Sequence, residues 1–256
     1  MNNRGNSRAA SRRAGECLSQ NGNRLLLIEA LLISLLFVPM YVLLDAACSA
    51  VLLLVDPVGM LPYVIMACFS VLFFGTALFF VLPTLMGFLF LGESVRRGRN
   101  PVLADLFYFF CSRERYSIAL SLSARFLWKL ALIATAIRVT EVLGATYLPD
   151  QFFSLLLCAL LIAAELIAGV LWCLSEFPLL YLCLCVGEDE PQGESRLCQA
   201  PAVSALRFFG AFLPQILLGI LTCGVLLIGD TLPRMAVAYF EYCDRLFYTA
   251  ATPDLD

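Results

Sequence analysis

The amino-acid sequence predicts an all-α membrane protein, a polytopic bundle of about six transmembrane helices with two interfacial helices on its cytoplasmic side. Three observations support this fold class. Hydrophobic residues make up 61% of the 256 residues and charged residues only 14%. The mean hydropathy is +0.87, and the apolar residues gather in long blocks. A soluble domain carries about a quarter charged residues, so lipid is the expected solvent of most of the chain.

Turn residues and polar connectors divide the apolar blocks into six stretches. Pro57 and Gly59 end the first stretch, Pro149 and Asp150 separate the third from the fourth, and residues 229–233 divide the last block. At about 1.5 Å per residue, a stretch of this kind crosses roughly 30 Å of hydrocarbon. The predicted spans are 25–55, 61–91, 117–143, 152–186, 205–228 and 231–248, within a membrane domain of residues 24–248.

The basic residues predict the orientation of the bundle. Five arginines lie in residues 1–24 and five in the connector between the second and third spans. Arg196 and Arg207 flank the connector between the fourth and fifth spans, and Arg245 lies at the C-terminal end. The three connectors that alternate with these, residues 56–60, 144–151 and 229–232, contain no Lys or Arg. Because cytoplasmic loops are enriched in Lys and Arg, both ends are expected in the cytoplasm, residues 1–23 as a disordered basic tail and 249–256 as a short tail.

Seven arginines on this side are candidate contacts for anionic lipid headgroups. Each basic residue near such a surface contributes about 1 kcal/mol. Their alternative role, which needs no partner, is to keep the tail and the connector in the cytoplasm. The candidates are Arg4, Arg8, Arg12, Arg13, Arg96, Arg97 and Arg99.

Two short amphipathic segments are predicted to lie in the headgroup plane. Asn100 and Pro101 suit the start of the first helix. Its apolar face would comprise Val102, Leu103, Leu106, Phe107 and Phe110. Residues 201–209 repeat the pattern Pro-x-[Leu/Val]-x-x-Leu-x-[Tyr/Phe]-Phe of residues 101–109. We hypothesise two units of one interfacial helix and two spans, preceded by an initial hairpin.

Four charged residues in the third and fourth spans require partners or water, because a charge near the bilayer centre costs roughly 2.5–3.5 kcal/mol. Since these spans are antiparallel, Arg125 is expected opposite Glu176, and Lys129 opposite Glu165. Mutual neutralisation would fix the register of the two helices. The alternatives are a polar pathway for an ion or a headgroup, and a third helix that starts later, with its charges at the interface.

The residue types exclude several chemistries. Histidine is absent and 11 cysteines are present, most of them within apolar runs. Nucleophile systems that need histidine are excluded, and the cysteines are expected to be small buried apolar residues rather than disulfides or metal ligands. Gly229 and Asp230 match half of an intramembrane aspartyl protease signature, without the first glycine or a second membrane aspartate. The sequence predicts no catalytic residue, no metal, no cofactor and no nucleic-acid partner.

Several motifs together resemble a known family. They are Gly169 with Pro178-Leu179-Leu180-Tyr181, the acidic connector and Ala202–Leu206, Gly229 with Pro233 and Tyr239-Phe240, and Gly98-Arg99-Asn100-Pro101 with Asp105-Leu106-Phe107. Over residues 60–247 this resembles the bacterial multi-pass membrane proteins classed as domain of unknown function 975. Apolar residues around Trp172, the charge of Glu176 and the arginine-rich tail depart from that family, which implies a divergent member. The resemblance implies a bacterial cytoplasmic membrane location and transfers no mechanism.

The function predicted from these features is that of a non-enzymatic scaffold or accessory component that presents cytoplasmic helices to lipid, to a membrane-protein partner or to a second copy of the chain. The alternative is a small transporter or lipid-handling protein that uses the charges of the third and fourth spans. Water access distinguishes the two, since a cavity that reaches Lys129 and Glu165 favours transport and a dry, paired interface favours a structural role.

Overall fold

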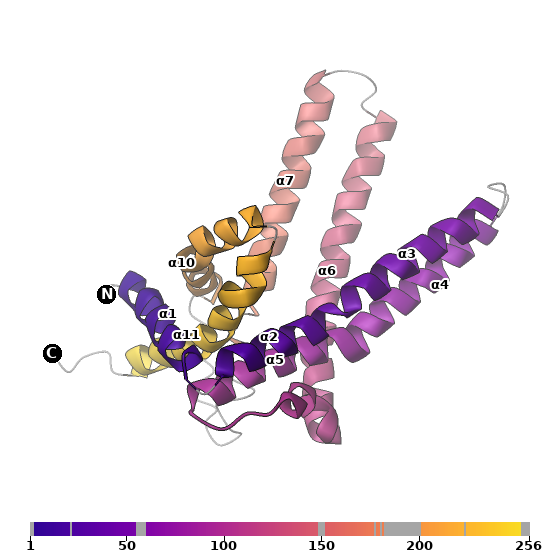
Figure 1. The fold of residues 1–256 in the computed structure, drawn as a ribbon. Coiled ribbons are helices and arrows are strands. Elements are labelled where there is room, and N and C mark those ends of the chain that lie inside the picture. Colours follow the sequence, from indigo (N-terminus) through magenta and orange to yellow (C-terminus); the bar gives the residue numbers. More distant parts are fainter. Residues whose placement is uncertain are drawn as a thin grey trace. The chain divides into compact units, whose positions relative to one another are not determined.

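The computed structural model shows an all-α protein (Figure 1). It describes residues 3–20, 22–54, 60–147, 152–176, 178–179, 181, 201–222 and 224–251, and their side chains except those of residues 3–8, 63, 138, 141–147, 152–157, 201–202 and 247–251. The predicted acidic connector around 187–200 and the tail beyond residue 251 therefore lie outside the described residues. The chain forms two compact units, unit 1 of residues 1–123 and 210–245 and unit 2 of residues 124–209 and 246–256.

Four helices of the described chain are long and apolar enough to cross a membrane, which confirms a multi-pass membrane protein in outline. Their apolar parts are Asn23–Leu54, Val64–Arg96, Arg113–Ile137 and Val203–Leu221, and a shorter apolar part is Cys158–Leu174. The helices of unit 1 are α1 (Asn3–Leu18), α2 (Asn23–Leu35), α3 (Phe37–Leu54), α4 (Leu61–Thr76), η1 (Ala77–Val81), α5 (Leu82–Arg96), η2 (Leu103–Cys111), η3 (Leu227–Thr231) and parts of α6 (Arg113–Tyr147), α10 (Pro201–Leu221) and α11 (Leu232–Ala251).

The first two predicted spans form one long antiparallel pair whose two ends differ. At one end α3 lies beside α4 (Figure 1), and α3 buries no residue at all. At the other end α2 lies beside α5, and α5 buries nine residues, among them the charged Glu93. Helices with no buried side chain and apolar residues on every side need lipid around them. The exposure of α3 is that expected of a helix surrounded by lipid, whereas α2 and α5 belong to the packed core of unit 1.

Proline residues account for the breaks between these two ends. Pro39 lies in the first turn of α3, and the helical hydrogen-bond pattern is interrupted just before it, at Leu36. Pro83 has no N–H to donate, and the preceding turn, η1, is a π-helix in which the Leu82 N–H bonds to the Ala77 carbonyl. Because Pro83 has no N–H, the Phe79 carbonyl, four residues earlier, lacks its usual helical donor. The Tyr116 hydroxyl donates to this carbonyl instead, at 3.0 Å. Both breaks separate the lipid-exposed end from the core.

The length of α3 agrees with this expectation. Its 18 residues extend about 27 Å at 1.5 Å per residue, close to the roughly 30 Å of a bilayer's hydrocarbon. The whole apolar segments of 32 and 33 residues are much longer than one crossing requires. These segments largely coincide with the predicted spans 25–55 and 61–91, whose boundaries in the membrane stay a prediction.

The first predicted interfacial helix exists, but it is the 3₁₀-helix η2, and it begins later than predicted. Its first residues are capped by Asp105, whose carboxylate accepts the Val102 N–H at 3.0 Å. The helix is kinked at Phe107. Leu106 and Phe109, three residues apart, are buried, whereas Phe107 and Phe110 are exposed. The predicted shared face of Leu106 and Phe107 is therefore wrong, since it assumed the α-helical period.

Glycine at position 87 allows η2 to lie directly on α5. A Cβ at Gly87 would lie 1.8 Å from the Leu106 carbonyl oxygen, so no other residue fits this position. Behind this contact, Tyr108 stacks on Phe90 with ring centroids 3.8 Å apart. Residues 201–209, in contrast, form the first part of the uninterrupted α-helix α10. The two copies of the sequence pattern thus differ in structure, because an extended residue, Ser112, follows only the first copy.

The N-terminal segment forms α1, whereas the sequence predicts a disordered tail over residues 1–23. Ala10, Ala14 and Leu18 recur at helical spacing and are 0%, 1% and 5% exposed. The helix contacts α2 and α5. Small apolar residues on one face therefore order a segment whose overall composition is polar.

Helix α11 differs most from its predicted role as the sixth span. It follows the π-helix η3, and Pro233 leaves the Gly229 carbonyl without its usual donor, as Pro83 does in the first hairpin. The Arg24 Nε donates to this carbonyl at 2.8 Å, and its guanidinium lies 3.5 Å from the Asp230 carboxylate. The predicted outer connector 229–232 thus touches a residue predicted at the cytoplasmic boundary. The structure differs here from an outside-to-inside crossing by residues 231–248.

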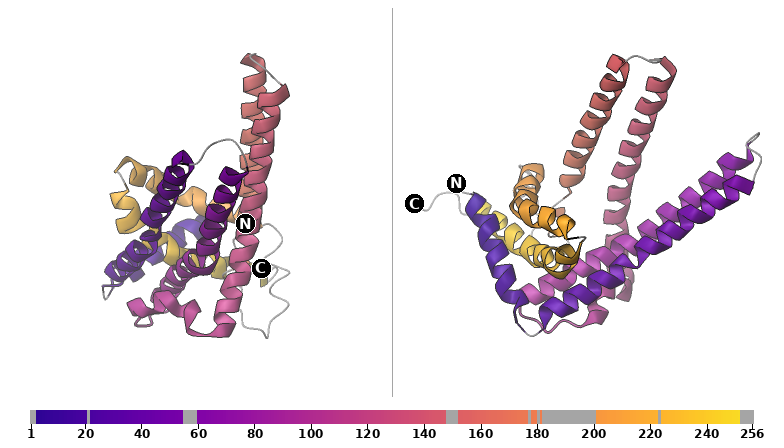
Figure 2. Two further views of the ribbon diagram at one scale, coloured as in Figure 1. Left: turned by 90° about the vertical axis from the view of Figure 1, so that its right-hand side faces the viewer. Right: turned by 45° about the horizontal axis from the view of Figure 1, so that its top comes forward.

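Unit 2 contains the antiparallel helices α6, from Ala124 onward, and α7 (Phe152–Leu174) (Figure 2). They approach closely at Gly169, where a Cβ would lie 2.7 Å from the side chain of Ile133. The described part of α7 ends at Leu174, and its turn continues to Ser175 and Glu176. The end of the predicted fourth span, up to residue 186, lies mostly outside the described residues.

A charge reversal tests whether Arg24 and Asp230 lie on the same side of the membrane. Arg24→Glu and Asp230→Arg should each lower stability, and the double variant should recover part of the loss. Because Arg24 is half exposed, the coupling is expected to be about 0.5–1 kcal/mol, measured by SDS-induced unfolding followed by circular dichroism. The same cycle with Arg99→Glu, an exposed arginine, serves as the control. A coupling of zero would support the six-span arrangement, in which the two residues face opposite sides.

Candidate functional site

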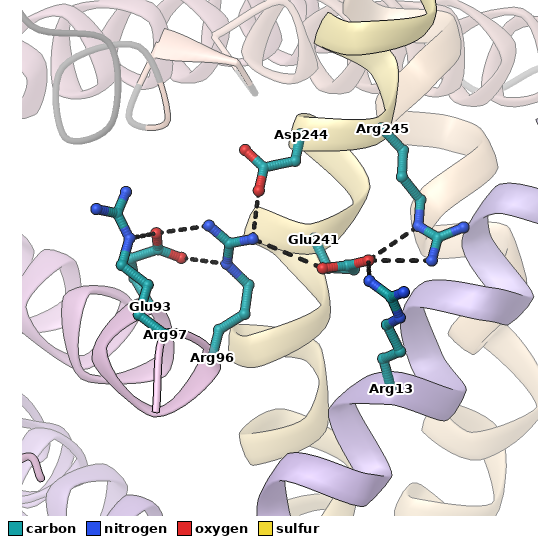
Figure 3. Close-up of polar contacts among 7 residues, drawn as sticks. All are labelled: Arg13, Glu93, Arg96, Arg97, Glu241, Asp244 and Arg245. Atoms are coloured by element: carbon teal, nitrogen blue, oxygen red, sulfur yellow. Dashed lines mark hydrogen bonds and ion pairs between the residues drawn. The ribbon is translucent and has the colours of Figure 1, made fainter. Parts of the chain in front are cut away.

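An ion-pair cluster joins three helices of unit 1 at the end remote from α3 and α4. Figure 3 shows its side chains pointing toward one another from α1, α5 and α11. Four arginines face three carboxylates, and the members are Arg13, Glu93, Arg96, Arg97, Glu241, Asp244 and Arg245. We call these seven residues the α1–α5–α11 cluster.

Glu93 is the most deeply buried charge of the cluster, with 4% of its surface exposed. Its two carboxylate oxygens accept hydrogen bonds from Arg96, at 2.6 Å from Nε and 2.8 Å from Nη2. The Arg97 Nε donates to the same carboxylate. The two arginines lie three and four residues after Glu93, so one helical turn places all three groups together. A buried carboxylate is tolerable only with such partners.

Arg96 extends the cluster to α11, since its Nη1 also donates to Asp244 and lies 3.6 Å from the Glu241 carboxylate. Glu241 in turn accepts from the Arg13 Nη1 at 2.9 Å and from the Arg245 Nε at 3.0 Å. Only a planar guanidinium with donors on several edges can face three carboxylates at once. Arg96 therefore connects α5 to α11, and Glu241 connects α11 to α1.

Close packing of backbones supports these ion pairs. A Cβ at Gly92 would lie 2.8 Å from the Ala236 carbonyl carbon, so α5 and α11 touch through small residues. Along α11, residues from Ala236 to Cys243 are almost all buried. The charged side chains thus extend from a tightly packed pair of helices, which fixes their positions.

A small polar cavity of about 360 Å³ lies beside the cluster, lined by α1, α5 and α11. Cys17 on its wall is half buried, and burial together with the charges of Glu241 and Glu16 raises the pKa of its thiol. A raised pKa keeps the thiol protonated, which is the opposite of an activated nucleophile. Within the described part of the chain, no group of three or more Cys, Asp or Glu side chains is placed to hold a metal ion.

A second polar site lies in unit 2, around Lys129 of α6. Its ammonium group, 8% exposed as a residue, forms an ion pair with Glu176. It also donates to the Trp172 carbonyl and to the Ser175 hydroxyl, each at 3.1 Å. The Trp172 ring centroid lies 5.1 Å from the same nitrogen, within cation–π range. The turn at the end of α7 thus surrounds the cation with acceptors.

The predicted pairing of charges differs from the observed one. Lys129 pairs with Glu176, which the sequence assigned to Arg125. Glu165 accepts a hydrogen bond from the Thr140 hydroxyl at 2.6 Å, and its other oxygen is buried without a donor. Arg125 is exposed and makes no ion pair among the described residues. The pairing differs because α7 ends at Leu174. Glu176 therefore lies on the turn that follows the helix, where its carboxylate reaches Lys129 instead of the level of Arg125.

An apolar pocket of about 550 Å³ adjoins this site, between α6, α7 and the first part of α10. Its walls are aliphatic and aromatic side chains together with a single charged residue, Glu176. A charged pathway for an ion would need polar groups along its length. The pocket offers none beyond a carboxylate that is already paired, so it suits an apolar chain rather than an ion.

Of the seven predicted lipid-contacting arginines, four have carboxylate partners in the structure. Arg12 faces Glu16, and Arg13, Arg96 and Arg97 belong to the cluster. Arg99 is exposed, and the side chains of Arg4 and Arg8 lie outside the described residues. The sequence prediction overlooked Glu93, Glu241 and Asp244. The spacing of Glu93 to Arg97 and of Glu241 to Arg245, one helical turn in each case, was the signal that could have revealed them.

Comparison with protein-family models, with curated proteins and with solved structures finds no match to this chain. The resemblance to the family classed as domain of unknown function 975 therefore stays a prediction from the sequence motifs. The site is interpreted below from its geometry alone.

Removal of Arg96 tests whether the cluster holds the core of unit 1 together. Arg96→Gln leaves the buried Glu93 and its neighbours on α11 without their shared cation, so a loss of roughly 3 kcal/mol in unfolding free energy is expected. Arg96→Lys should recover only part of it, because an ammonium group cannot reach three carboxylates. Arg99→Gln, three residues later and exposed, is the matched control. Equal stability of the Arg96 and Arg99 variants would contradict the role of the cluster.

A double-mutant cycle tests the pair of Lys129 and Glu176. Lys129→Met leaves a carboxylate without its cation and should cost roughly 3 kcal/mol, whereas Lys129→Met with Glu176→Gln should recover most of the loss. Arg125→Met, one helical turn earlier on the same helix, should change stability by less than about 0.5 kcal/mol. Unfolding in detergent of these variants and of Glu176→Gln alone, in a Trp128→Phe background so that only Trp172 fluoresces, gives the values of the cycle. Additive losses would show that the two residues do not interact.

Proposed function

We propose that the chain is a non-enzymatic membrane scaffold that displays a helical core on the cytoplasmic side of the bilayer. The observation that carries this proposal is the division of unit 1. Helix α3 buries no residue, while α1, α2, α5, η2 and α11 bury theirs against one another and carry the ion-pair cluster. An anchor in lipid with a stable, folded core attached is the arrangement expected of a component that other proteins or lipids contact.

The cytoplasmic orientation of this core is part of the proposal, and the basic residues support it. The core and its neighbouring segments contain most of the arginines, including Arg13, Arg24, Arg96 and Arg99. Short segments rich in Lys and Arg stay on the cytoplasmic side. The ion pair between Arg13 and Glu241 joins segments near the two ends of the chain, so both ends would face the cytoplasm. The resemblance to bacterial membrane proteins agrees with a bacterial cytoplasmic membrane, which we include in the proposal.

Transport has weaker support. The Lys129 ammonium has a carboxylate, a carbonyl and a hydroxyl as partners, and the adjoining pocket is almost wholly apolar. A paired cation beside an apolar pocket supports a structural role for the third and fourth predicted spans. The non-enzymatic part of the proposal is supported at the cluster by Cys17, whose raised pKa keeps its thiol protonated and so a poor nucleophile.

Protease protection in sealed vesicles tests the orientation. An epitope tag at each end of the full-length chain should be digested in inverted vesicles and protected in right-side-out vesicles, because the α1–α5–α11 cluster requires both ends on one side. A tag inserted after Pro57, between α3 and α4, should give the opposite result. Digestion of the two terminal tags from opposite sides would overturn the proposed arrangement.

A further inference from the structure

One face of η2 exposes apolar side chains beside arginines. It comprises three apolar residues that are 57%, 45% and 36% exposed, Val102, Phe107 and Phe110. Three exposed arginines flank them, Arg99, Arg113 and Arg115. We call these six residues the η2 face. Its opposite side, Leu106 and Phe109, is buried against the core.

None of the three arginines forms an ion pair with a carboxylate in the described part of the chain. Arg115 lies over the Tyr108 ring at 4.2 Å from its centroid, which orients the guanidinium while leaving its edges available. The nearest acidic residues do not neutralise this charge. Asp105 accepts the Val102 N–H at the start of η2, and Glu114 is a single exposed carboxylate among three arginines.

Two contacts fix the depth of the η2 face. The Tyr116 hydroxyl, in the first turn of α6, bonds to the Phe79 carbonyl in the π-helix η1, where the lipid-exposed end of the hairpin meets the core. Arg113 and Arg115 lie within three residues of Tyr116 and so at this same level. Leu106 of η2 lies on Gly87, only four residues after Pro83. At about 1.5 Å per residue, the η2 face therefore lies within roughly 6 Å of the hydrocarbon boundary.

We propose that the η2 face is a binding surface for anionic phospholipid, with Phe107 and Phe110 inserted among the acyl chains and Arg99, Arg113 and Arg115 on the headgroup phosphates. The depth places these residues where headgroups lie. Aromatic rings and arginines side by side are the chemistry of a helix that binds the surface of a charged bilayer. The other basic residues of the region, Arg96 and Arg97, are paired with Glu93, so the exposed arginines carry the lipid preference. The proposal goes beyond the scaffold role, because a scaffold needs no particular lipid.

Fluorescence quenching by brominated lipids tests the insertion. In full-length protein with Trp128→Phe and Trp172→Phe, a single tryptophan is introduced as Phe107→Trp. Reconstitution with phosphatidylcholine brominated near the headgroup end of its chains should quench this tryptophan. Leu43→Trp on α3, 70% exposed, is the control for the bilayer interior and should be quenched most by lipid brominated deeper. Ser19→Trp on the core is the control for water and should not be quenched by either lipid.

The preference for anionic lipid is tested by replacing a small fraction of the bilayer with brominated phosphatidylglycerol. Phe107→Trp should be quenched several times more by this lipid than by an equal fraction of brominated phosphatidylcholine. Each of Arg99→Gln, Arg113→Gln and Arg115→Gln should lower the enrichment by up to about fivefold. Arg12→Gln, an exposed arginine of α1, should leave it unchanged.

Three results would overturn the proposal. Equal quenching of Phe107→Trp by the two brominated lipids would show insertion without headgroup preference. Quenching by aqueous iodide instead of lipid would show that the face points to water and is open to a protein partner. An enrichment that survives all three arginine replacements together would assign the lipid preference to other residues.

Discussion

Arg96 connects the parts of the core, since its guanidinium faces Glu93 on its own helix and Glu241 and Asp244 on α11. Glu93 is buried and needs cations, so the core can form only where arginines converge on it. Glu241 then attracts Arg13 and brings α1 onto the other two helices. The shared cation thus acts together with the buried face of α1 and the close contact of Gly92 with Ala236 to hold α1, α5 and α11 together. Without it, three helices would carry charges that neither lipid nor an apolar core accepts.

Proline residues set the boundary between this core and the bilayer. Pro39 and Pro83 interrupt the two arms of the first hairpin, and on the lipid side of the interruptions α3 buries nothing. Each π-helix releases a carbonyl, and a side chain from another helix satisfies it, Tyr116 for Phe79 and Arg24 for Gly229. A carbonyl that a proline leaves without its helical donor needs such a partner when water is scarce. The same residues that break the helices therefore also attach neighbouring segments to them.

The two polar sites solve the problem of charge near lipid in different ways. In the α1–α5–α11 cluster, the charges form a network in which Arg96 faces three carboxylates and Glu241 faces three arginines. Around Lys129, a single cation is enclosed by a carboxylate, a carbonyl, a hydroxyl and an aromatic ring within one helical hairpin. Both arrangements neutralise charges between packed helices. On the η2 face, in contrast, three arginines of the described chain are exposed without an ion-pair partner.

The sequence by itself determined the membrane class, the number of apolar blocks and their turns, because long apolar runs and prolines act locally and independently of tertiary packing. It also predicted that the charges of the third and fourth blocks need partners. The tertiary structure decided which partners they have. Glu176 replaced Glu165 beside Lys129 because α7 ends early, and α11 joined the core because Arg24, Arg96 and Arg13 offer its acidic residues better partners than lipid does. Ordering of α1 likewise follows from its contacts with α5, which is distant in the sequence, and the conformation of η2 from its close approach to Gly87 of α5. No local sequence pattern contains either contact.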